Sequence, residues 1–478
     1  MSPRRNRLPR RPELWVWLAV LLCFRPGALP AQVLEPRTLG RSVDGVVVTG
    51  DLLPELIGVP LERIRVYAEL QGSLQVIPFQ ADELTPDRSA FILPQGAKSN
   101  RTLSDGVFSV QDEVAFMAKD LGGKVPRSAW PAGALQSAEL EVIDPLDLSR
   151  GWAYLFAFRS PPALSARDYV VWDAAAGEVR TAAYVNGYPP GGKAIYFSRI
   201  VGQPPEYGSG VDYVDRMKLR FHFVALWGLV SFDGNEDSAG QRIVGEKDGP
   251  VRVLRRGQVY YQLPFGIKYN AGGTLQIYWE SFGQGPVELA MPGGVSAVLK
   301  QALMISSTDL SPEAYGMRFY TDQDLEGVLI DGKMSEKEKA LDPTGSHWNL
   351  ITGEQGSLLL RAPSNVPVLP REDNYRQWID DVSQPDPPEE FPGRIGCLVS
   401  YFNLAALPKG HWRSAALFYT PPRNFDPKRV PEYLRIEDHP LVLRAGDKIG
   451  RSHILPWHPT LPEDYYRNYQ PLPGEKPI

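Results

Sequence analysis

The sequence predicts an all-β protein with two antiparallel β-sandwich domains, the second larger than the first, and three observations support this. Short runs in which apolar and polar residues alternate, such as RIRVYAEL at 63–70, recur between turn-forming residues. Proline and glycine contribute 45 and 44 of the 478 residues, which limits the length of each strand. Long apolar stripes with helical spacing are absent. One short helix is expected at 336–341, because Ser335 and Glu338 have the spacing of a capping box.

Residues 1–31 have the pattern of a secretory signal peptide. Several arginines precede an apolar run, LWVWLAVLLCF at 14–24, and the segment ends in the small residue Ala31. That run is too short to cross a bilayer of about 30 Å as a helix. An uncleaved membrane anchor is the alternative, but Pro26 and Pro30 would break a longer helix. We therefore expect an exported protein that is periplasmic, at the cell surface or extracellular.

The charge of the remaining chain excludes some partners. Residues 1–31 hold six Arg and one Glu, so their removal leaves 45 basic and 55 acidic side chains and a net charge of −10. An acidic chain without a basic tract is a poor candidate for binding nucleic acid or an anionic membrane surface. No later stretch is apolar for long enough to be a transmembrane segment, so the mature chain is expected to be soluble.

Cysteine usage argues against disulfides and most metal sites. Cys397 is the only cysteine outside the leader, so no intrachain disulfide can form, and its apolar context RIGCLVSYF predicts a buried strand residue. The sequence has no C-x-x-C pair, which excludes covalently attached haem and argues against structural zinc. No cofactor and no metal are expected, with calcium as the one open candidate.

The first domain is expected at about 40–165, and it contains the stretch SDGVFSVQDEVAFMAKDLGG at 104–123. A calcium loop needs oxygen ligands at alternate positions, but Val107 and Phe108 follow Asp105 and Gly106. We expect a turn in which Asp105–Gly106 forms the bend and Asp112 accepts hydrogen bonds from backbone N–H groups. An irregular calcium site is the alternative.

The second domain is expected at 166–422, followed by a C-terminal segment at 423–478. A polar, proline-dense excursion at 362–393 interrupts the domain, and a loop of that length is expected to cover a site or dock a neighbour. The C-terminal segment is expected to lie along the body as an extended strap, because its aromatic residues would otherwise be exposed to water. No repeat of 20–50 residues is present, which argues against a propeller or solenoid.

Three segments of the second domain resemble galactose-mutarotase-like proteins in their order and strand rhythm. They are EKDGPVRVLRR at 246–256, LQIYWESFGQGPVEL at 275–289 and HWNLITGEQGSLLLR at 347–361. The resemblance covers about 170 residues and includes no catalytic signature. It implies a large antiparallel supersandwich, a fold shared by polysaccharide lyases, hydrolases and inert accessory domains, and it implies a carbohydrate ligand. Fold alone does not establish function.

The strongest candidate site is the strand in DRMKLRFHFVALWG at 215–228. Alternation places Leu219, Phe221 and Phe223 on the core face. The opposite face then carries three side chains that are cationic or can become so: Lys218, Arg220 and His222. Such groups repel one another, so their adjacency in an acidic protein needs a reason.

Three further residues complete the candidate ligand-binding set: Arg252, Tyr278 and Glu280. Together the six suit an acidic sugar, since cations neutralise its carboxylate and aromatic rings stack on pyranose faces. His222 or a tyrosine could then abstract a proton, which is lyase chemistry. The structural alternative is a sheet face on which Glu280 and Asp215 balance the positive charges. Catalytic residues cannot be assigned from the sequence.

Other signals are weaker. Four histidines, namely His411, His439, His453 and His458, fall within 411–458, but their spacing does not match a zincin motif. There is no G-x-S-x-G elbow, no Walker A loop and no dinucleotide-binding fingerprint. Asn100 begins a glycosylation acceptor sequence, which matters only in a eukaryotic host.

These observations lead to three ranked expectations. The first is an exported accessory protein that binds a glycan or a cell-surface component. The second is a polysaccharide lyase or hydrolase that acts on an acidic sugar. The third is a structural partner in a cell-envelope or extracellular assembly, bound to a cell-surface protein.

Overall fold

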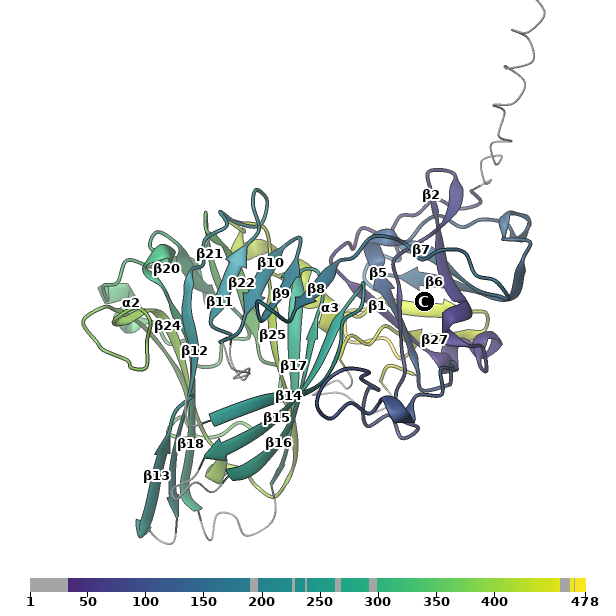
Figure 1. Cartoon of the computed structure of the whole chain (residues 1–478). Coiled ribbons are helices and arrows are strands. Elements are labelled where there is room, and N and C mark those ends of the chain that lie inside the picture. The colour runs from purple at the N-terminus through teal and green to yellow at the C-terminus, as the bar shows by residue number, and fades with distance from the viewer. Residues whose placement is uncertain are drawn as a thin grey trace, which may run out of the picture.

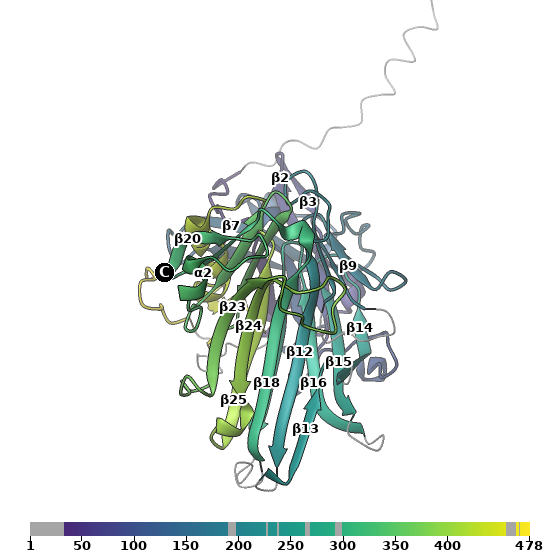
Figure 2. The same ribbon diagram turned by 90° about the vertical axis from the view of Figure 1, so that its left-hand side faces the viewer.

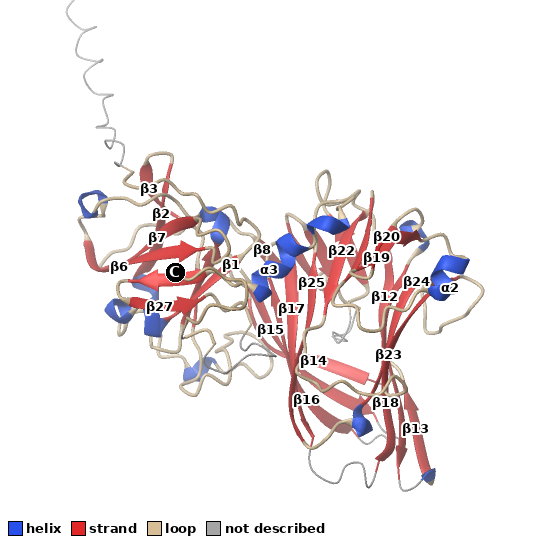
Figure 3. Cartoon of the chain, turned by 180° about the vertical axis from the view of Figure 1, so that it is seen from behind, coloured by secondary structure: helices blue, strands red, loops and turns tan. Residues whose placement is uncertain are grey.

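The computed structural model describes residues 33–189, 197–225, 228–236, 239–262, 268–291, 299–455, 465–467 and 469–478. The expected signal peptide and His458 lie outside these ranges. The predicted fold class is confirmed, because the described residues form mainly strands, which pair in antiparallel sheets (Figure 3).

Two sheets form the N-terminal domain. The first has the order β1-β5-β4, and the second has the order β27-β26-β6-β7-β2-β3. Their bounds are β1 (Gly45–Thr49), β5 (Glu113–Met117), β4 (Gln80–Asp82), β27 (Lys448–Arg451), β26 (Val442–Ala445), β6 (Ala134–Ile143), β7 (Arg150–Phe158), β2 (Ile64–Leu70) and β3 (Ser73–Val76). Val46, Phe116 and Leu155 belong to the core between these sheets, which apolar burial stabilises.

A nine-stranded sheet forms the centre of the larger domain, in the order β14-β15-β16-β17-β25-β22-β21-β19-β20. Its strands are β14 (Ala239–Lys247), β15 (Val253–Gln262), β16 (Lys268–Tyr278), β17 (Phe282–Met291), β25 (Gly410–Tyr419), β22 (Gly356–Arg361), β21 (Asn349–Gly353), β19 (Arg318–Thr321) and β20 (Asp324–Leu329). One face packs on the remaining sheets of this domain, and the other contacts the N-terminal domain (Figure 1).

The remaining sheets of the larger domain have five and four described strands. The five-stranded sheet has the order β13 (Val230–Gly234), β12 (Val214–Ala225), β18 (Leu299–Leu310), β24 (Arg394–Asn403) and β23 (Asn374–Asp381). The four-stranded sheet has the order β11 (Arg199–Gly202), β10 (Tyr184–Gly187), β9 (Glu178–Thr181) and β8 (Val170–Asp173). Trp378, Leu398 and Phe418 lie in the core between the five- and nine-stranded sheets.

The described helices are short. The two α-helices are α2 (Glu336–Ala340) and α3 (Pro431–Asp438), and Ser335 and Glu338 form the predicted capping box of α2. The 3₁₀ turns are η1 (Gly50–Leu52), η2 (Pro54–Leu56), η3 (Leu61–Arg63), η4 (Arg101–Leu103), η5 (Ala118–Asp120), η6 (Arg127–Ala129), η9 (Pro312–Ala314), η10 (Leu404–Ala406) and η11 (Pro427–Arg429). Within the described ranges, no helix has the length and apolar character needed to cross a bilayer.

The two domains share an apolar contact. Val47 and Met117 of the three-stranded sheet belong to one core cluster with Trp279 and Leu417 of the larger domain. A Cβ atom at Gly45 would lie 2.6 Å from the Trp279 ring, so only glycine allows β1 to approach the indole this closely. Residues that are far apart in the sequence therefore form one continuous core that spans both domains.

The C-terminal segment differs from the expected extended strap. It contains α3, whose Tyr433 and Ile436 are buried in the core shared by the domains, and the β26–β27 hairpin. β26 pairs with β6, so the end of the chain completes a sheet of the N-terminal domain (Figure 1). An edge strand with unpaired backbone groups recruits another strand readily, and β26 supplies it.

The excursion at 362–393 also contains regular structure. β23 lies within it and forms the edge of the five-stranded sheet, where it pairs with β24. Figure 2 shows the outer face of this sheet, with β12, β18, β24 and β23 side by side. Trp378, Ile379 and Asp380 are consecutive and buried, so this end of β23 is covered on both faces of the sheet.

Candidate functional site

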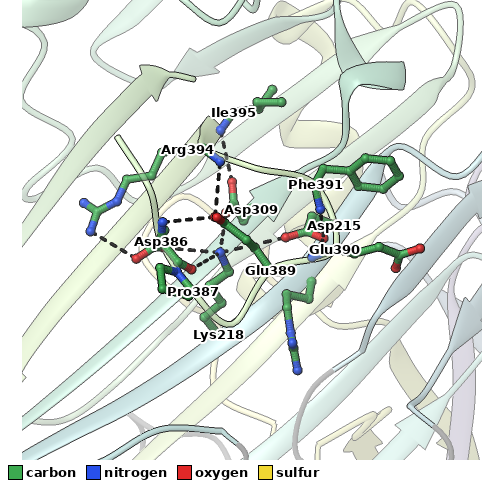
Figure 4. A network of polar contacts seen from close by, with 12 residues as sticks. Asp215, Lys218, Asp309, Asp386, Pro387, Glu389, Glu390, Phe391, Arg394 and Ile395 are labelled. Atoms are coloured by element: carbon green, nitrogen blue, oxygen red, sulfur yellow. Dashed lines mark hydrogen bonds and ion pairs between the residues drawn. The ribbon is translucent and has the colours of Figure 1, made fainter. Parts of the chain in front are cut away.

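The predicted row of cations on β12 begins in a buried ionic network (Figure 4). The Lys218 side chain is 1% exposed, and its Nζ atom lies 2.7 Å from a carboxylate oxygen of Asp309. Carboxylate oxygens of Asp386 and Asp215 lie 3.3 and 3.8 Å from the same atom. The ammonium group is therefore fully matched by negative charge and has no vacancy for a ligand.

The network holds residues 386–395 on the outer face of the five-stranded sheet. The N–H groups of Glu390 and Phe391 donate to Asp215 at 2.9 and 3.2 Å. Arg220 and Arg394 both pair with Asp386. The excursion thus covers Lys218 and Arg220, and both cations stabilise the covering segment through Asp386.

Burial controls the titration of this network. Burial raises the pKa of the Asp309 carboxyl to about 6, although Lys218 lies beside it. Burial alone would lower the pKa of Lys218, but the neighbouring Asp309 carboxylate holds it above its ordinary value. These pKa shifts arise because the charged groups are buried. Buried ion pairs with a purely structural role show such shifts as functional sites do.

The same network contains a possible but unsuitable metal set. One ligand atom each of Asp309, Asp386 and Cys397 lie within 4.8 Å of one another. Burial raises the pKa of the Cys397 thiol far above its ordinary value, which disfavours the thiolate form. Lys218 already supplies the positive charge at Asp309 and Asp386. Cys397 itself is fully buried, as the sequence predicted.

The predicted site residues outside β12 lie apart from the row on that strand, so the six candidates do not form one site. Arg252 lies at the contact between the domains, 2.7 Å from Asp82 and 2.5 Å from Glu113. The remaining three candidates each have a different partner. Tyr278 forms a hydrogen bond with Tyr188, Glu280 forms an ion pair with Lys119, and the His222 Nδ1 atom lies 2.7 Å from an Asp233 carboxylate oxygen.

This outcome corrects the prediction of one basic surface. The alternation of β12 is present, with Lys218, Arg220 and His222 on the outer face and Phe221 buried. Acidic partners from distant segments neutralise the cations, which periodicity within one strand cannot reveal. Of the two proposed balancing acids, Asp215 joins Lys218, whereas Glu280 pairs elsewhere.

The stretch at 104–123 has the expected backbone role. Asp112 accepts hydrogen bonds from the N–H groups of Ser109 and Leu84 at 2.7 and 2.9 Å. Asp105 accepts from the N–H group of Val107, and Gly106 has a φ of +66°, as a tight turn requires. Glu113 is committed to Arg252, so these acids do not converge on one point.

The histidines do not gather into a metal site among the described residues. His411 lies on β25, and the His439 Nδ1 atom is 3.7 Å from Glu475. The His453 Nε2 atom is 3.7 Å from Glu113. The three described histidines share no carboxylate partner, and the proximity of their positions in the sequence has no counterpart in space.

A pocket that the sequence reasoning missed lies between the five- and nine-stranded sheets. Its volume is about 190 Å³, and residues of β12, β18, β23 and β24 line one side. Arg376 of β23 contributes its guanidinium group, which donates to the Ser346 carbonyl oxygen at 3.0 Å. No carboxylate of the described residues lies within 4.0 Å of this group. Burial lowers the pKa of Arg376, and the more distant Asp322 carboxylate partly opposes this shift. Arg376 is thus a partly buried cation that forms no ion pair with a described residue.

Three hydroxyl groups accompany Arg376 on the inner face of the sheet. Ser306 lies opposite Ser400, and Ser400 lies opposite Arg376, so the three form a row across neighbouring strands. Thr308 follows Ser306 on the same face and also lines the pocket. None of the three hydroxyls is hydrogen-bonded to a described residue. Inner faces of sandwiches are normally apolar, which makes this polar row an exception.

The opposite wall comes from the nine-stranded sheet and is mainly apolar, with the side chains of Leu360, Ala416 and Phe418. Arg361 lies at this wall, but Asp438 matches its charge at 2.7 Å, and an oxygen of the buried Glu437 carboxyl lies 3.3 Å away. The pocket thus offers one positive charge without an ion-pair partner, free hydroxyls and an apolar surface. That combination suits a small unit carrying one negative charge.

A sequence signal for this pocket existed in NYRQWIDD at 374–381. Alternation there places Arg376 on the same face as the core residue Trp378, which is an unusual position for a cation. The proline-dense surroundings led to an interpretation as a polar loop, so the inward arginine was not recognised. The hydroxyl row could not be found at all, since it requires the pairing of three strands.

No protein-family model matches the chain, and no curated protein matches it in sequence. Two solved structures from Enterococcus faecalis share a partial likeness: an alpha-mannosidase from strain V583, with a TM-score of 0.41, and a protein in glycosyl hydrolase family 38, with a TM-score of 0.42. Both are 9% identical to this chain and cover 89% of it. The matches cover 46% and 47% of those chains, so this chain spans about half their length. Similarity at this level carries no conclusion about activity or family.

Proposed function

We propose that the protein binds an acidic glycan and holds one anionic sugar unit in the pocket between the five- and nine-stranded sheets. The observation that carries this proposal is the unmatched Arg376 beside the row of free hydroxyls. A buried charge is costly unless an opposite charge or strong hydrogen bonds compensate it. A carboxylate or sulfate on a sugar would supply that compensation, and the three hydroxyls would bond its ring substituents.

The size and lining of the pocket favour binding of a single unit. A volume of about 190 Å³ is below the range of about 300–1,000 Å³ that is typical of drug-sized ligands. The apolar wall of Leu360, Ala416 and Phe418 offers a surface for the carbon face of a sugar ring. The resemblance to galactose-mutarotase-like proteins agrees with a carbohydrate ligand, and the expected signal peptide agrees with a target outside the cytoplasm.

An accessory binding role fits the lining better than catalysis. Glycoside hydrolysis commonly uses a pair of carboxylates, and lyase chemistry needs a base near the acidic carbon. The residues that line this pocket include no carboxylate, histidine or tyrosine. The lyase or hydrolase alternative would therefore need a second site.

Calorimetric titration with hexagalacturonate and with a chondroitin sulfate hexasaccharide tests the proposal. We expect binding of at least one of them, and a loss of affinity of about tenfold between about 0.05 and about 0.5 M NaCl, because salt screens the charge of Arg376. Arg376→Gln should reduce the affinity by at least about tenfold, which corresponds to about 1.4 kcal/mol. Arg376→Lys should retain part of it, because the charge remains while the guanidinium fork is lost.

Arg371→Gln is the matched control, because Arg371 lies on the same segment but is exposed and paired with Asp342. This control should bind as the wild type does. Thermal unfolding of both variants shows whether folding is preserved. The proposal is refuted if neither acidic oligosaccharide binds, or if well-folded Arg376→Gln binds with unchanged affinity.

A further inference from the structure

A second recess lies in the N-terminal domain, on the outer face of its six-stranded sheet. Its volume is about 430 Å³. The floor comes from β6, and the walls come from the segment at 124–130 and from the turn that follows β26. Because β26 belongs to the C-terminal hairpin, this recess is complete only when the end of the chain has joined the first domain.

The charges that line this recess are balanced. Three cations, Lys124, Arg127 and Arg444, face three carboxylates, Glu55, Glu139 and Glu141. Glu141 lies 3.1 Å from Arg444 and Lys124 lies 3.7 Å from Glu139, so much of the charge is already paired within the protein. The recess therefore has no excess charge that would select an anion or a cation.

Several polar groups in the recess remain uncommitted. Arg127, Glu55 and Ser137 form no side-chain hydrogen bond or ion pair with a described residue. The Arg127 guanidinium lies over the Trp130 ring, 5.1 Å from its centre. The Trp130 ring is half-buried and is held by edge contacts to Tyr154 and Phe156, at 5.7 and 5.4 Å between ring centres. A rigid aromatic ring thus stands beside a free donor and a free acceptor.

We infer that this recess is a second binding site, specific for an uncharged oligosaccharide segment. Sugar hydroxyls both donate and accept hydrogen bonds. Arg127 can therefore donate to them, the Glu55 carboxylate can accept from them, and the Ser137 hydroxyl can do either. The indole of Trp130 provides an amphipathic surface at low cost in conformational entropy. The volume of about 430 Å³ lies within the usual range for small-ligand sites.

This site is independent of Arg376, which lies in the other domain and recognises charge. The protein would then contact a glycan at two points with different chemistry, one acidic and one neutral. Two linked contacts raise the overall affinity when a ligand can reach both. The order of affinity among neutral sugars follows from the hydroxyl pattern facing Arg127 and Glu55.

Titration with cellohexaose, mannohexaose and xylohexaose, on the full chain, tests this inference. At least one hexasaccharide should bind, and its affinity should change less than about twofold between about 0.05 and about 0.5 M NaCl, because no net charge is recognised. The double variant Glu55→Gln with Arg127→Gln should weaken binding by at least about fivefold. Both side chains are exposed, so the substitutions should leave the thermal midpoint unchanged.

Two control variants separate the two proposals. Arg101→Gln, an exposed arginine of the same domain, should bind neutral hexasaccharides as the wild type does, and so should Arg376→Gln. The inference is overturned if no neutral hexasaccharide binds, if the double variant binds normally, or if affinity falls strongly with salt. In each of these cases binding of the acidic oligosaccharides would still depend on Arg376, so the proposed function would stand.

Discussion

Two arginines of the larger domain differ in their partners: Arg252, buried at the contact between the two domains, and Arg376, partly buried in the pocket between the two large sheets. Arg252 lies between Asp82 and Glu113 and near the rings of Phe91 and Trp279. Arg376 has the Ser346 carbonyl and hydroxyl groups as its protein partners and no carboxylate within ion-pair reach among the described residues.

The difference shows how a buried cation can be assigned to structure or to binding. A matched cation stabilises the elements that supply its partners, and removal of one member leaves the other charges buried and unpaired. An unmatched cation contributes little to stability, and its energetic deficit can be met by a ligand. Sequence alone cannot separate the two cases, because both are arginines near strands.

The largest effect on stability is expected for Arg252→Met. The substitution leaves Glu113 without its cation and Asp82 with Lys247 alone, so the free energy of unfolding should fall by about 3–5 kcal/mol. Urea denaturation followed by tryptophan fluorescence measures this change. Arg256→Met, on the same strand, should cost less than about 1 kcal/mol, because Arg256 makes one exposed hydrogen bond to a carbonyl. Equal losses in the two variants would show that the ionic contact does not join the domains.

A smaller loss is expected for Lys218→Met, about 2–4 kcal/mol. Asp309 loses its ion pair, whereas Arg220 and Arg394 still hold Asp386. Amide hydrogen exchange of residues 383–393 should become faster, since the covering segment loses part of its attachment. Lys300→Met, an exposed position on β18, is the control and should leave both measurements unchanged. Unaltered exchange in Lys218→Met would mean that other contacts fix the segment.

Glu437 lies between the matched and the unmatched case. It is buried, and only one of its two carboxyl oxygens has a partner, Arg361. Burial raises the pKa of its carboxyl to about 8, from an ordinary value of 4.5. The folded protein therefore holds this proton at a pH where the unfolded chain has released it. The contribution of protonated Glu437 to the free energy of unfolding should therefore decline as the pH rises from about 5 to about 8, by at most about 1.4 kcal/mol per pH unit.

Denaturation of Glu437→Gln across this pH range tests the assignment, because an amide cannot titrate and the decline should become shallower. Glu432→Gln, on the same helix, is the control. Its hydrogen bond from Arg429 holds the pKa of Glu432 below the ordinary value, so its contribution changes only at more acidic pH. Parallel pH profiles for wild type and Glu437→Gln would contradict the raised pKa. Arg376→Gln should give the smallest change in the free energy of unfolding among these variants, together with a large loss of affinity for the acidic oligosaccharides.

Several features followed from short stretches of sequence. The two-residue alternation predicted the all-β class and the faces of β12, and the spacing of Ser335 and Glu338 predicted the cap of α2. The apolar context of Cys397 predicted its burial. In each case the determining contacts lie within a few residues, so backbone geometry and local hydrogen bonding are sufficient.

The tertiary structure alone decided which charges are matched, which edges are completed and where a polar row faces a core. Lys218 meets Asp386 across 168 residues of sequence, and Arg252 meets Asp82 across 170. β26 completes a sheet that began with the first strands of the chain, and the row of Ser306, Ser400 and Arg376 exists only because three strands pair in one register. Local periodicity fixes which face of a strand a residue occupies, but the partner of that face comes from distant segments, and the partner determines whether a charge stabilises the fold or remains available to a ligand.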